Sequence, residues 1–121
     1  MNSAPTLYEM IGPDGQVGMK LLVATLRVTK TELAHASGIS WDSLSKASRL
    51  NSRATQAKLR DFVEIIYRVL PWTGSLPQAF AWYRAQAIPS FGDRTAEDLV
   101  KAGHAKEVMA YLSRLAVGGY A

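Results

Sequence analysis

Few side chains in this sequence have the type and spacing that catalysis needs. There are two histidines, His35 and His104, and no cysteine. Neither histidine stands in a metal-ligand or nucleophile–base pattern, and without cysteine there is no disulfide, thiolate zinc site or thiol nucleophile. The adjacent carboxylates Glu97 and Asp98 fall in the first turn of an expected helix, where we favour stabilisation by the helix dipole over acid–base chemistry. We therefore expect no active site, no cofactor and no metal.

The distribution of charge points to binding instead. The chain has 14 basic and 10 acidic residues, a net charge of +4. Residues 20–60 hold eight basic residues against two acidic ones, which leaves +6, whereas residues 71–121 hold five against four. A concentrated basic region suits contact with phosphates, because binding releases counterions from nucleic acid. A solvated surface explains the same charge equally well, so charge alone does not decide.

Length and composition indicate a folded protein of modest size. A chain of 121 residues that is 48% hydrophobic and 20% charged can bury a core, which excludes general disorder and a multidomain enzyme. The N-terminal sequence MNSAPTLYEM lacks the basic start and apolar run of a secretory signal. No apolar run approaches the roughly 18 residues of a membrane span. We expect a cytoplasmic protein.

Hydrophobic spacing predicts an all-α fold. The polar residues 1–18, with Pro5 and the turn-forming sequence GPDG at 12–15, predict an arm followed by a turn. Helices are expected at residues 16–28, 54–70, 76–86, 96–103 and 104–117. Pro71 should end the 54–70 helix, and Ser75 and Thr95 should cap the two that follow. Residues 87–92 read as a loop, and no strand-like alternation of useful length is present.

Two short helices are predicted between residues 29 and 46. Thr29 and Glu32 have the spacing of a capping box, which starts the first helix. Gly38 can take the left-handed conformation that ends it, and Ser40 is suited to cap a second helix from Trp41. The two helices should meet across a tight turn.

The segment from Glu32 to Lys46 resembles a helix-turn-helix of the Xre/Cro repressor type. Ala34 is small where the two helices cross, and Ile39 and Leu44 are apolar where the second helix docks. The candidates for contact with DNA are Ser40, Ser43, Ser45, Lys46 and Arg49. Asp42 opposes phosphate unless it accepts from a cytosine amino group or caps the helix, and Trp41 could equally pack inward.

Three stretches of the C-terminal third look like the toxin-binding domain of Xre/MbcA/ParS antitoxins. They are QAFAWYR at residues 78–84, IPSFGDRTAEDLV at 88–100 and LAVGGYA at 115–121. The resemblance covers nearly the whole chain after the arm. It implies three parts: an N-terminal arm (1–18), an Xre-like helix-turn-helix domain (19–70) and a small helical toxin-binding domain (71–121).

The resemblance implies a type II antitoxin in a bacterial cytoplasm. Its partner would be similar to RES-domain toxins, which degrade NAD or transfer its ADP-ribose, and the antitoxin's C-terminus would plug the toxin's NAD pocket. The matching positions here are Gly118, Gly119, Tyr120 and Ala121. A Gly-Gly hinge can thread a narrow entrance, a tyrosine can anchor an interface, and a terminal carboxylate suits a cationic pocket. Without the resemblance, this segment reads as an ordinary frayed end.

Further toxin contacts are expected from Arg84 and Arg94. Trp82 and Tyr83, on the same helix as Arg84, are expected to face the toxin as well, although Trp82 fits a core position equally well. Arg94 fits either a bond across an interface or a bond within its own loop. One recognition helix offers little interface, so we expect a homodimer on operator DNA, within a complex with the toxin. The alternatives are a stand-alone Xre-family repressor, whose C-terminal helices serve only dimerisation, and a helix-turn-helix that no longer binds DNA.

Overall fold

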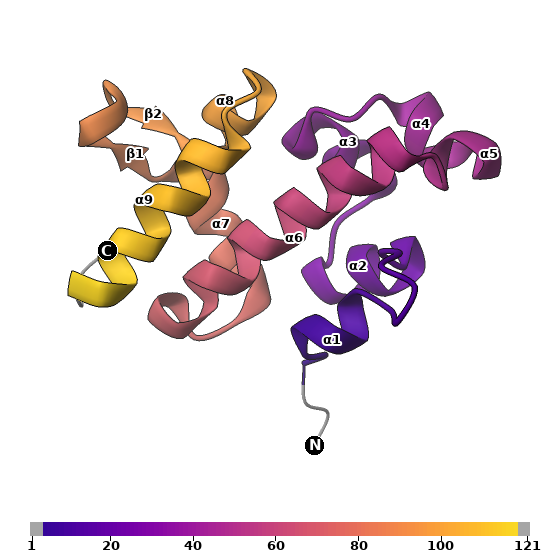
Figure 1. Ribbon diagram of the computed structural model, residues 1–121, viewed down its shortest axis with the longest axis horizontal. Helices are drawn as coiled ribbons and strands as arrows, with labels where there is room; N and C mark the ends of the chain where they lie inside the picture. Colours follow the sequence, from indigo (N-terminus) through magenta and orange to yellow (C-terminus); the bar gives the residue numbers. More distant parts are fainter. Residues whose placement is uncertain (1–3, 119–121) are drawn as a thin grey trace.

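The computed structural model describes residues 4–118, and there the chain is mostly helical, which confirms the all-α prediction (Figure 1). The helices are α1 (Leu7–Met10), α2 (Met19–Leu26), α3 (Lys30–Ser37), α4 (Trp41–Ser45), α5 (Ala47–Leu50), α6 (Arg53–Thr73), α7 (Leu76–Ala85), α8 (Ala96–Lys101) and α9 (Ala105–Gly118). Between α7 and α8, strands β1 (Ala87–Ile88) and β2 (Arg94–Thr95) pair antiparallel around the 3-10 helix η1 (Pro89–Phe91). Strands of two residues are too short to leave an alternating pattern, so the sequence predicted only a loop.

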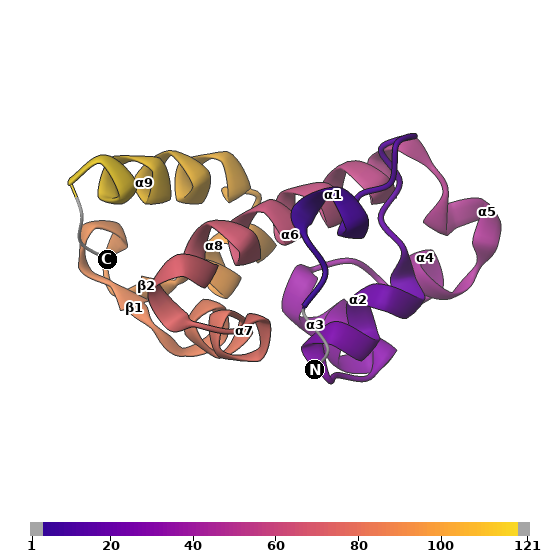
Figure 2. The same cartoon turned by 90° about the horizontal axis from the view of Figure 1, so that it is seen from below.

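Helix α6 connects two groups of elements. It has 21 residues, which corresponds to about 30 Å along its axis. Figure 2 shows α2–α5 toward its N-terminal end and α7–α9 toward its C-terminal end. Its buried residues include Leu59, Phe62, Val63 and Ile66, at the spacing of three and four that predicted this helix. The helix therefore contributes to the core along most of its length.

The prediction that Pro71 ends this helix is wrong, because α6 continues to Thr73. Proline has a helical φ, and its missing N–H removes one hydrogen bond only in the last turn, where that loss is tolerated. The helix closes at Gly74, which is left-handed (φ 94°) and whose N–H donates to the Leu70 carbonyl at 2.9 Å. The boundary expected between residues 70 and 71 thus falls inside a continuous helix.

Residues 4–18 contain a short helix, α1, which the prediction of an arm followed by a turn did not include. Thr6 and Glu9 form a capping box that starts α1, although no helix was predicted here from the sequence. The turn expected at 12–15 is present, with the Gly15 N–H donating to the Gly12 carbonyl at 2.9 Å. Met10 and Val17, on either side of this turn, are buried in the core.

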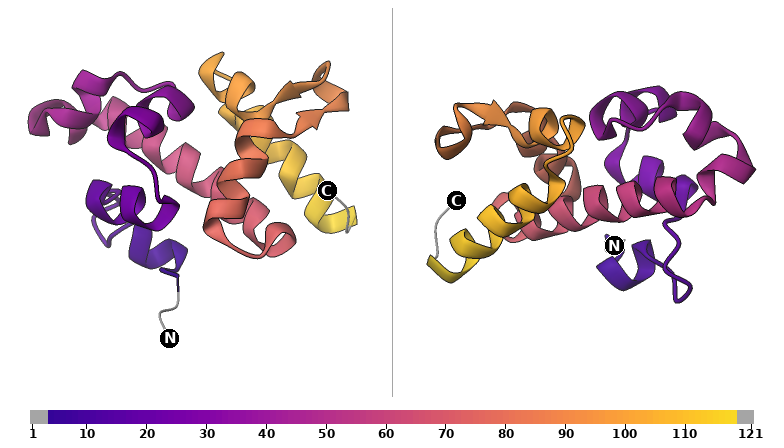
Figure 3. Two further views of the ribbon diagram at one scale, coloured as in Figure 1. Left: turned by 180° about the vertical axis from the view of Figure 1, so that it is seen from behind. Right: turned by 45° about the horizontal axis from the view of Figure 1, so that its top comes forward.

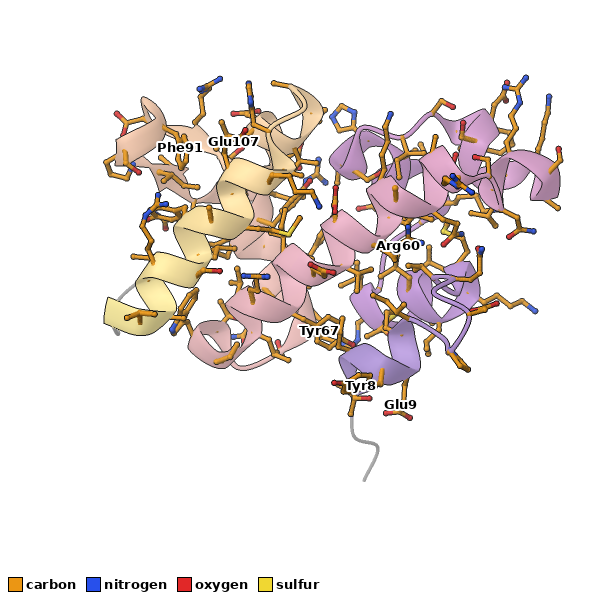
Figure 4. All side chains as sticks on the ribbon, viewed as in Figure 1. Tyr8, Glu9, Arg60, Tyr67, Phe91 and Glu107 are labelled. Carbon is orange, nitrogen blue, oxygen red and sulfur yellow. The ribbon has the colours of Figure 1, made fainter. Side chains whose placement is uncertain are left out.

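Three side chains of α6 hold this N-terminal segment through its backbone. The Tyr67 hydroxyl donates to the Pro5 carbonyl at 2.6 Å, Nη1 of Arg60 donates to the Gly15 carbonyl at 2.9 Å, and Oε1 of Gln56 accepts from the Val17 N–H at 2.8 Å. Figure 4 shows Tyr67 beside α1. Partial burial, with Glu9 nearby, raises the pKa of Tyr67, so the hydroxyl keeps the proton that it donates.

Tyr83 joins the two groups of elements. Its side chain is fully buried on α7, edge-on to Phe62 at 5.1 Å between ring centroids. Its hydroxyl donates to the Ala36 carbonyl at 2.7 Å. Ala36 lies in the last turn of α3, where carbonyls lack partners within the helix, so α7 supplies the missing donor. The expectation that Tyr83 faces a partner protein is therefore wrong, because the side chain belongs to the core.

Candidate nucleic-acid interface and partner-binding region

The two short helices predicted in the first half are present as α3 and α4. Thr29 and Glu32 form the expected capping box, and Gly38 takes the left-handed conformation (φ 73°) that ends α3. Ser40 caps α4, with its Oγ accepting from the Ser43 N–H at 3.1 Å. Ile39 and Leu44 are buried, as the apolar pattern predicted. We refer to residues 30–45 as the α3–α4 unit.

The turn of the α3–α4 unit rests on α8. In both views of Figure 3, α3 (purple) and α8 (light orange) lie close to each other near the middle of the molecule. A Cβ at Gly38 would lie 3.3 Å from Cγ of Lys101 and 3.4 Å from its Cα. Glycine at 38 is thus required twice, for its positive φ and for this close approach. The C-terminal half consequently fixes the position of the turn.

Helix α4 is short, with only five residues. It ends at Ser45, and Lys46 is extended (φ −93°, ψ 121°) before the chain re-enters a helix at α5, which the sequence did not predict. The Lys46 N–H donates to the Asp42 carbonyl at the end of α4, and the Lys46 carbonyl accepts from the Leu50 N–H of α5. Lys46 therefore ends one helix and begins the next, and Arg49 belongs to α5.

The three serines predicted to contact DNA differ in their surroundings. Ser40 is exposed, and its hydroxyl donates to the Ser43 hydroxyl at 2.9 Å. The Ser45 hydroxyl oxygen is buried, with no hydrogen-bond partner among the described residues. Ser40 and Ser43 thus lie together at the start of α4, whereas the Ser45 hydroxyl points into the protein.

Lys46 and Arg49 are both exposed and gather around one carboxylate. Lys46 Nζ and Arg49 Nη1 each lie 4.0 Å from Oδ2 of Asp42, whose side chain is 55% exposed. The sequence did not predict this pairing, and the residue that caps α4 is Ser40 rather than Asp42. Exposed pairs at this distance are weak, so both cations can turn to another anion.

Trp41 faces the solvent. The sequence left its direction open, and in the structure 53% of its surface is exposed, in the first turn of α4. Leu44 is the residue through which this short helix packs against the core. The exposed face from Trp41 to Arg49 therefore combines an aromatic ring, hydroxyls and two cations.

A second ion cluster lies in the C-terminal half and joins α7 to α8. Arg84 Nε donates to Oε1 of Glu97 at 2.7 Å, and Lys101 Nζ lies 3.6 Å from Oε2. Only 11% of the Glu97 side chain is exposed. Asp98 closes the capping box with Thr95, as expected for a first-turn carboxylate, whereas Glu97 serves as a buried ion-pair partner, which the sequence did not predict.

The other predicted toxin-binding residues lie at the C-terminal end of the molecule. Arg94 is exposed on β2, and its Nε donates to the Phe91 carbonyl at 3.1 Å, so it makes a bond within its own loop. Gly118 is the exposed last residue of α9, after Val117, which is 92% exposed. Gly119, Tyr120 and Ala121 lie outside the described residues.

The two histidines lie outside both ion clusters. His35 is exposed, and Nδ1 of the exposed His104 lies 3.5 Å from a carboxylate oxygen of Glu107. No group of three or more potential ligands could hold a metal ion within residues 4–118. In the same residues, no helix combines the length and apolar character needed to cross a membrane.

No protein-family model, curated protein or solved structure matches the chain.

Proposed function

We propose that this protein is a type II antitoxin of the Xre/MbcA/ParS kind, which neutralises a RES-domain toxin and represses its own operon. In this proposal the α3–α4 unit is a helix-turn-helix that binds operator DNA, and residues 118–121 insert into the toxin's NAD site. The protein acts as a homodimer within the toxin–antitoxin complex in the bacterial cytoplasm.

The observation that carries the DNA-binding part is the exposed face of the α3–α4 unit and α5. Ser40, Ser43, Lys46 and Arg49 present hydroxyl and cationic groups next to one another, and a buried Leu44 anchors the helix beneath them. These are the groups that position a protein on phosphates, and the net charge of +6 over residues 20–60 supplies the attraction. Ser45 is not proposed to contact DNA, because its hydroxyl is buried.

The toxin-binding part is supported by the end of α9. Val117 and Gly118 are exposed, so the C-terminal segment starts at the protein surface. Arg84 is held by Glu97 and keeps a third of its side chain exposed, which leaves room for a contact through its outer edge. Arg94 uses Nε within its loop, and its two terminal nitrogens can reach a partner.

A truncation tests the toxin-binding part. We expect deletion of residues 118–121 to leave the melting temperature nearly unchanged and to abolish protection against the co-expressed neighbouring gene product, with NAD loss as readout. The matched control is Tyr8→Ala, which removes an exposed aromatic at the opposite end of the chain. If the truncated protein still protects, the plug mechanism is wrong.

Gel shifts with the DNA upstream of its own gene test the repressor part. Lys46→Ala and Arg49→Ala should each weaken binding across sequences and reduce the salt dependence by about one unit of slope. Tight binding that the neighbouring gene product never alters would favour the stand-alone repressor. Binding without sequence preference at any salt concentration would refute repression.

A further inference from the structure

The start of α4 exposes an aromatic side chain where hydrogen-bonding groups would be expected. Trp41 is 53% exposed, whereas Leu44 on the same helix is buried. In a helix-turn-helix, the N-terminal residues of the second helix contact base edges in the major groove. The indole of Trp41 thus occupies a position from which a side chain can reach bases.

The polar groups beside Trp41 are partly engaged with each other. The Ser40 hydroxyl accepts from the Ser43 N–H and donates to the Ser43 hydroxyl. The Asp42 carboxylate forms ion pairs with Lys46 and Arg49, each at 4.0 Å. These groups are therefore less available to form hydrogen bonds with bases. The exposed indole of Trp41 remains as an apolar surface that could contact a base.

The charge around Trp41 selects the kind of partner. Lys46 and Arg49 are exposed around a single carboxylate, and residues 20–60 carry +6 overall. Asp42 balances only one of the two positive charges, so a polyanion complements this surface, whereas a neutral protein surface would desolvate the second cation without a counter-charge. Nucleic acid is accordingly the occupant that the charges favour.

We infer that the exposed indole of Trp41 reads the 5-methyl group of thymine in the major groove. Thymine is the base that carries an apolar group there, and apolar side chains contact it. Burial of the methyl group against the ring removes apolar surface of both from water. The inference rests on the proposed DNA binding and adds a base preference to it.

The experiment replaces thymines one at a time. The full-length chain first selects duplexes from a random-sequence library, and each thymine of the selected duplex is then exchanged for deoxyuridine, which pairs identically but lacks the methyl group. At one position in each half-site, we expect this exchange to weaken wild-type binding about 3-fold to 10-fold, the effect of roughly one buried methyl group.

Variants assign that effect to one side chain. Trp41→Ala should bind the selected duplex more weakly than wild type and should be insensitive to deoxyuridine at that position, as the coupling in a double-mutant cycle requires. Trp41→Phe should keep part of the sensitivity. The control Tyr8→Ala removes an aromatic that is 88% exposed on α1 and should keep both affinity and sensitivity. Circular dichroism melts check that each variant is folded.

Three results would overturn the inference. If Trp41→Ala keeps the wild-type sensitivity to deoxyuridine, another residue reads the methyl group. If Trp41→Ala changes the molecular mass in solution or toxin neutralisation and leaves DNA binding intact, Trp41 is a protein contact. If the wild-type chain selects no sequence, the DNA-binding part of the proposed function fails together with the inference, while the toxin-binding part stands on its own test.

Discussion

The N-terminal and C-terminal halves each contain a carboxylate held by two cations, and the two clusters differ in burial. Asp42 lies 4.0 Å from both Lys46 and Arg49, with 55% of its side chain exposed. Glu97 lies 2.7 Å from Arg84 and 3.6 Å from Lys101, with 11% exposed. The same chemical motif is therefore open to solvent in one half and enclosed in the other.

This difference separates charges that can bind a ligand from charges that hold the fold. In water the Asp42 pairs are weak, so their cations can exchange the carboxylate for a phosphate at little cost. Around Glu97 the lower dielectric strengthens the pair, and removal of one partner leaves the other poorly solvated. Formal charge alone does not distinguish the two clusters.

The largest effect is expected from breaking the enclosed cluster. Glu97→Ala removes the counter-charge of Arg84 and should lower the free energy of unfolding by about 2–3 kcal/mol, measured by urea denaturation. Asp42→Ala is the matched control in the open cluster and should change stability by less than about 0.5 kcal/mol. Equal losses in the two variants would contradict the distinction between the clusters.

Next in size is the loss of the hydrogen bond that joins the halves. Tyr83→Phe keeps the ring but leaves the Ala36 carbonyl without its donor, and should cost about 1–2 kcal/mol in the same denaturation experiment. Tyr8→Phe, on an exposed ring, should cost nothing measurable. A neutral Tyr83→Phe variant would show that another group satisfies this carbonyl.

The same tyrosine predicts a dependence on alkaline pH. Burial, and secondarily the Glu97 charge, raises the pKa of Tyr83 above its ordinary 10.0. The unfolded chain therefore releases this proton first, so the stabilising effect is complete below pH 10 and falls as the pH rises beyond it, by up to about 1.4 kcal/mol per pH unit. Tyr83→Phe should lose stability less steeply than wild type between pH 10 and 11. Parallel curves would refute this linkage.

The smallest effect is expected in the open cluster. Asp42→Asn removes the carboxylate beside Lys46 and Arg49, so affinity for a non-specific duplex should rise a few-fold at low salt, and the gain should vanish at high salt. Fluorescence anisotropy with a labelled duplex measures both. Glu107→Gln, in the C-terminal half, is the control and should leave duplex affinity unchanged; a fall in affinity for Asp42→Asn would mean that this carboxylate contacts the DNA directly.

Sequence signals that span a few residues predicted the structure well. The caps at Thr29, Ser40, Ser75 and Thr95 each depend on a residue within three positions, and all four are present. The direction of Trp41 could not be predicted, because exposed and buried positions of a five-residue helix leave no periodic pattern.

Contacts between distant residues were not predicted, because they depend on residues far apart in the sequence. Tyr83 and Ala36 are 47 positions apart, Tyr67 and Pro5 are 62 apart, and no local pattern pairs them. Arg84 and Glu97 are separated by the hairpin of β1 and β2, which itself was read as a loop. The sequence therefore favoured an arm and two modules and did not reveal that buried residues of all three parts, from Met10 to Leu112, form one hydrophobic cluster.

The long separation between the N-terminal segment and its partner on α6 also governs how the chain can fold during synthesis. Pro5 leaves the ribosome 62 residues before Tyr67, a delay of roughly 3–12 s at usual rates of translation. Throughout that interval Met10 and Val17 lack the helix against which they are buried. The first elements to be made consequently wait for more than half of the 121-residue chain before they can reach these native contacts. Nascent chains stalled before residue 67 should leave this segment open to proteases.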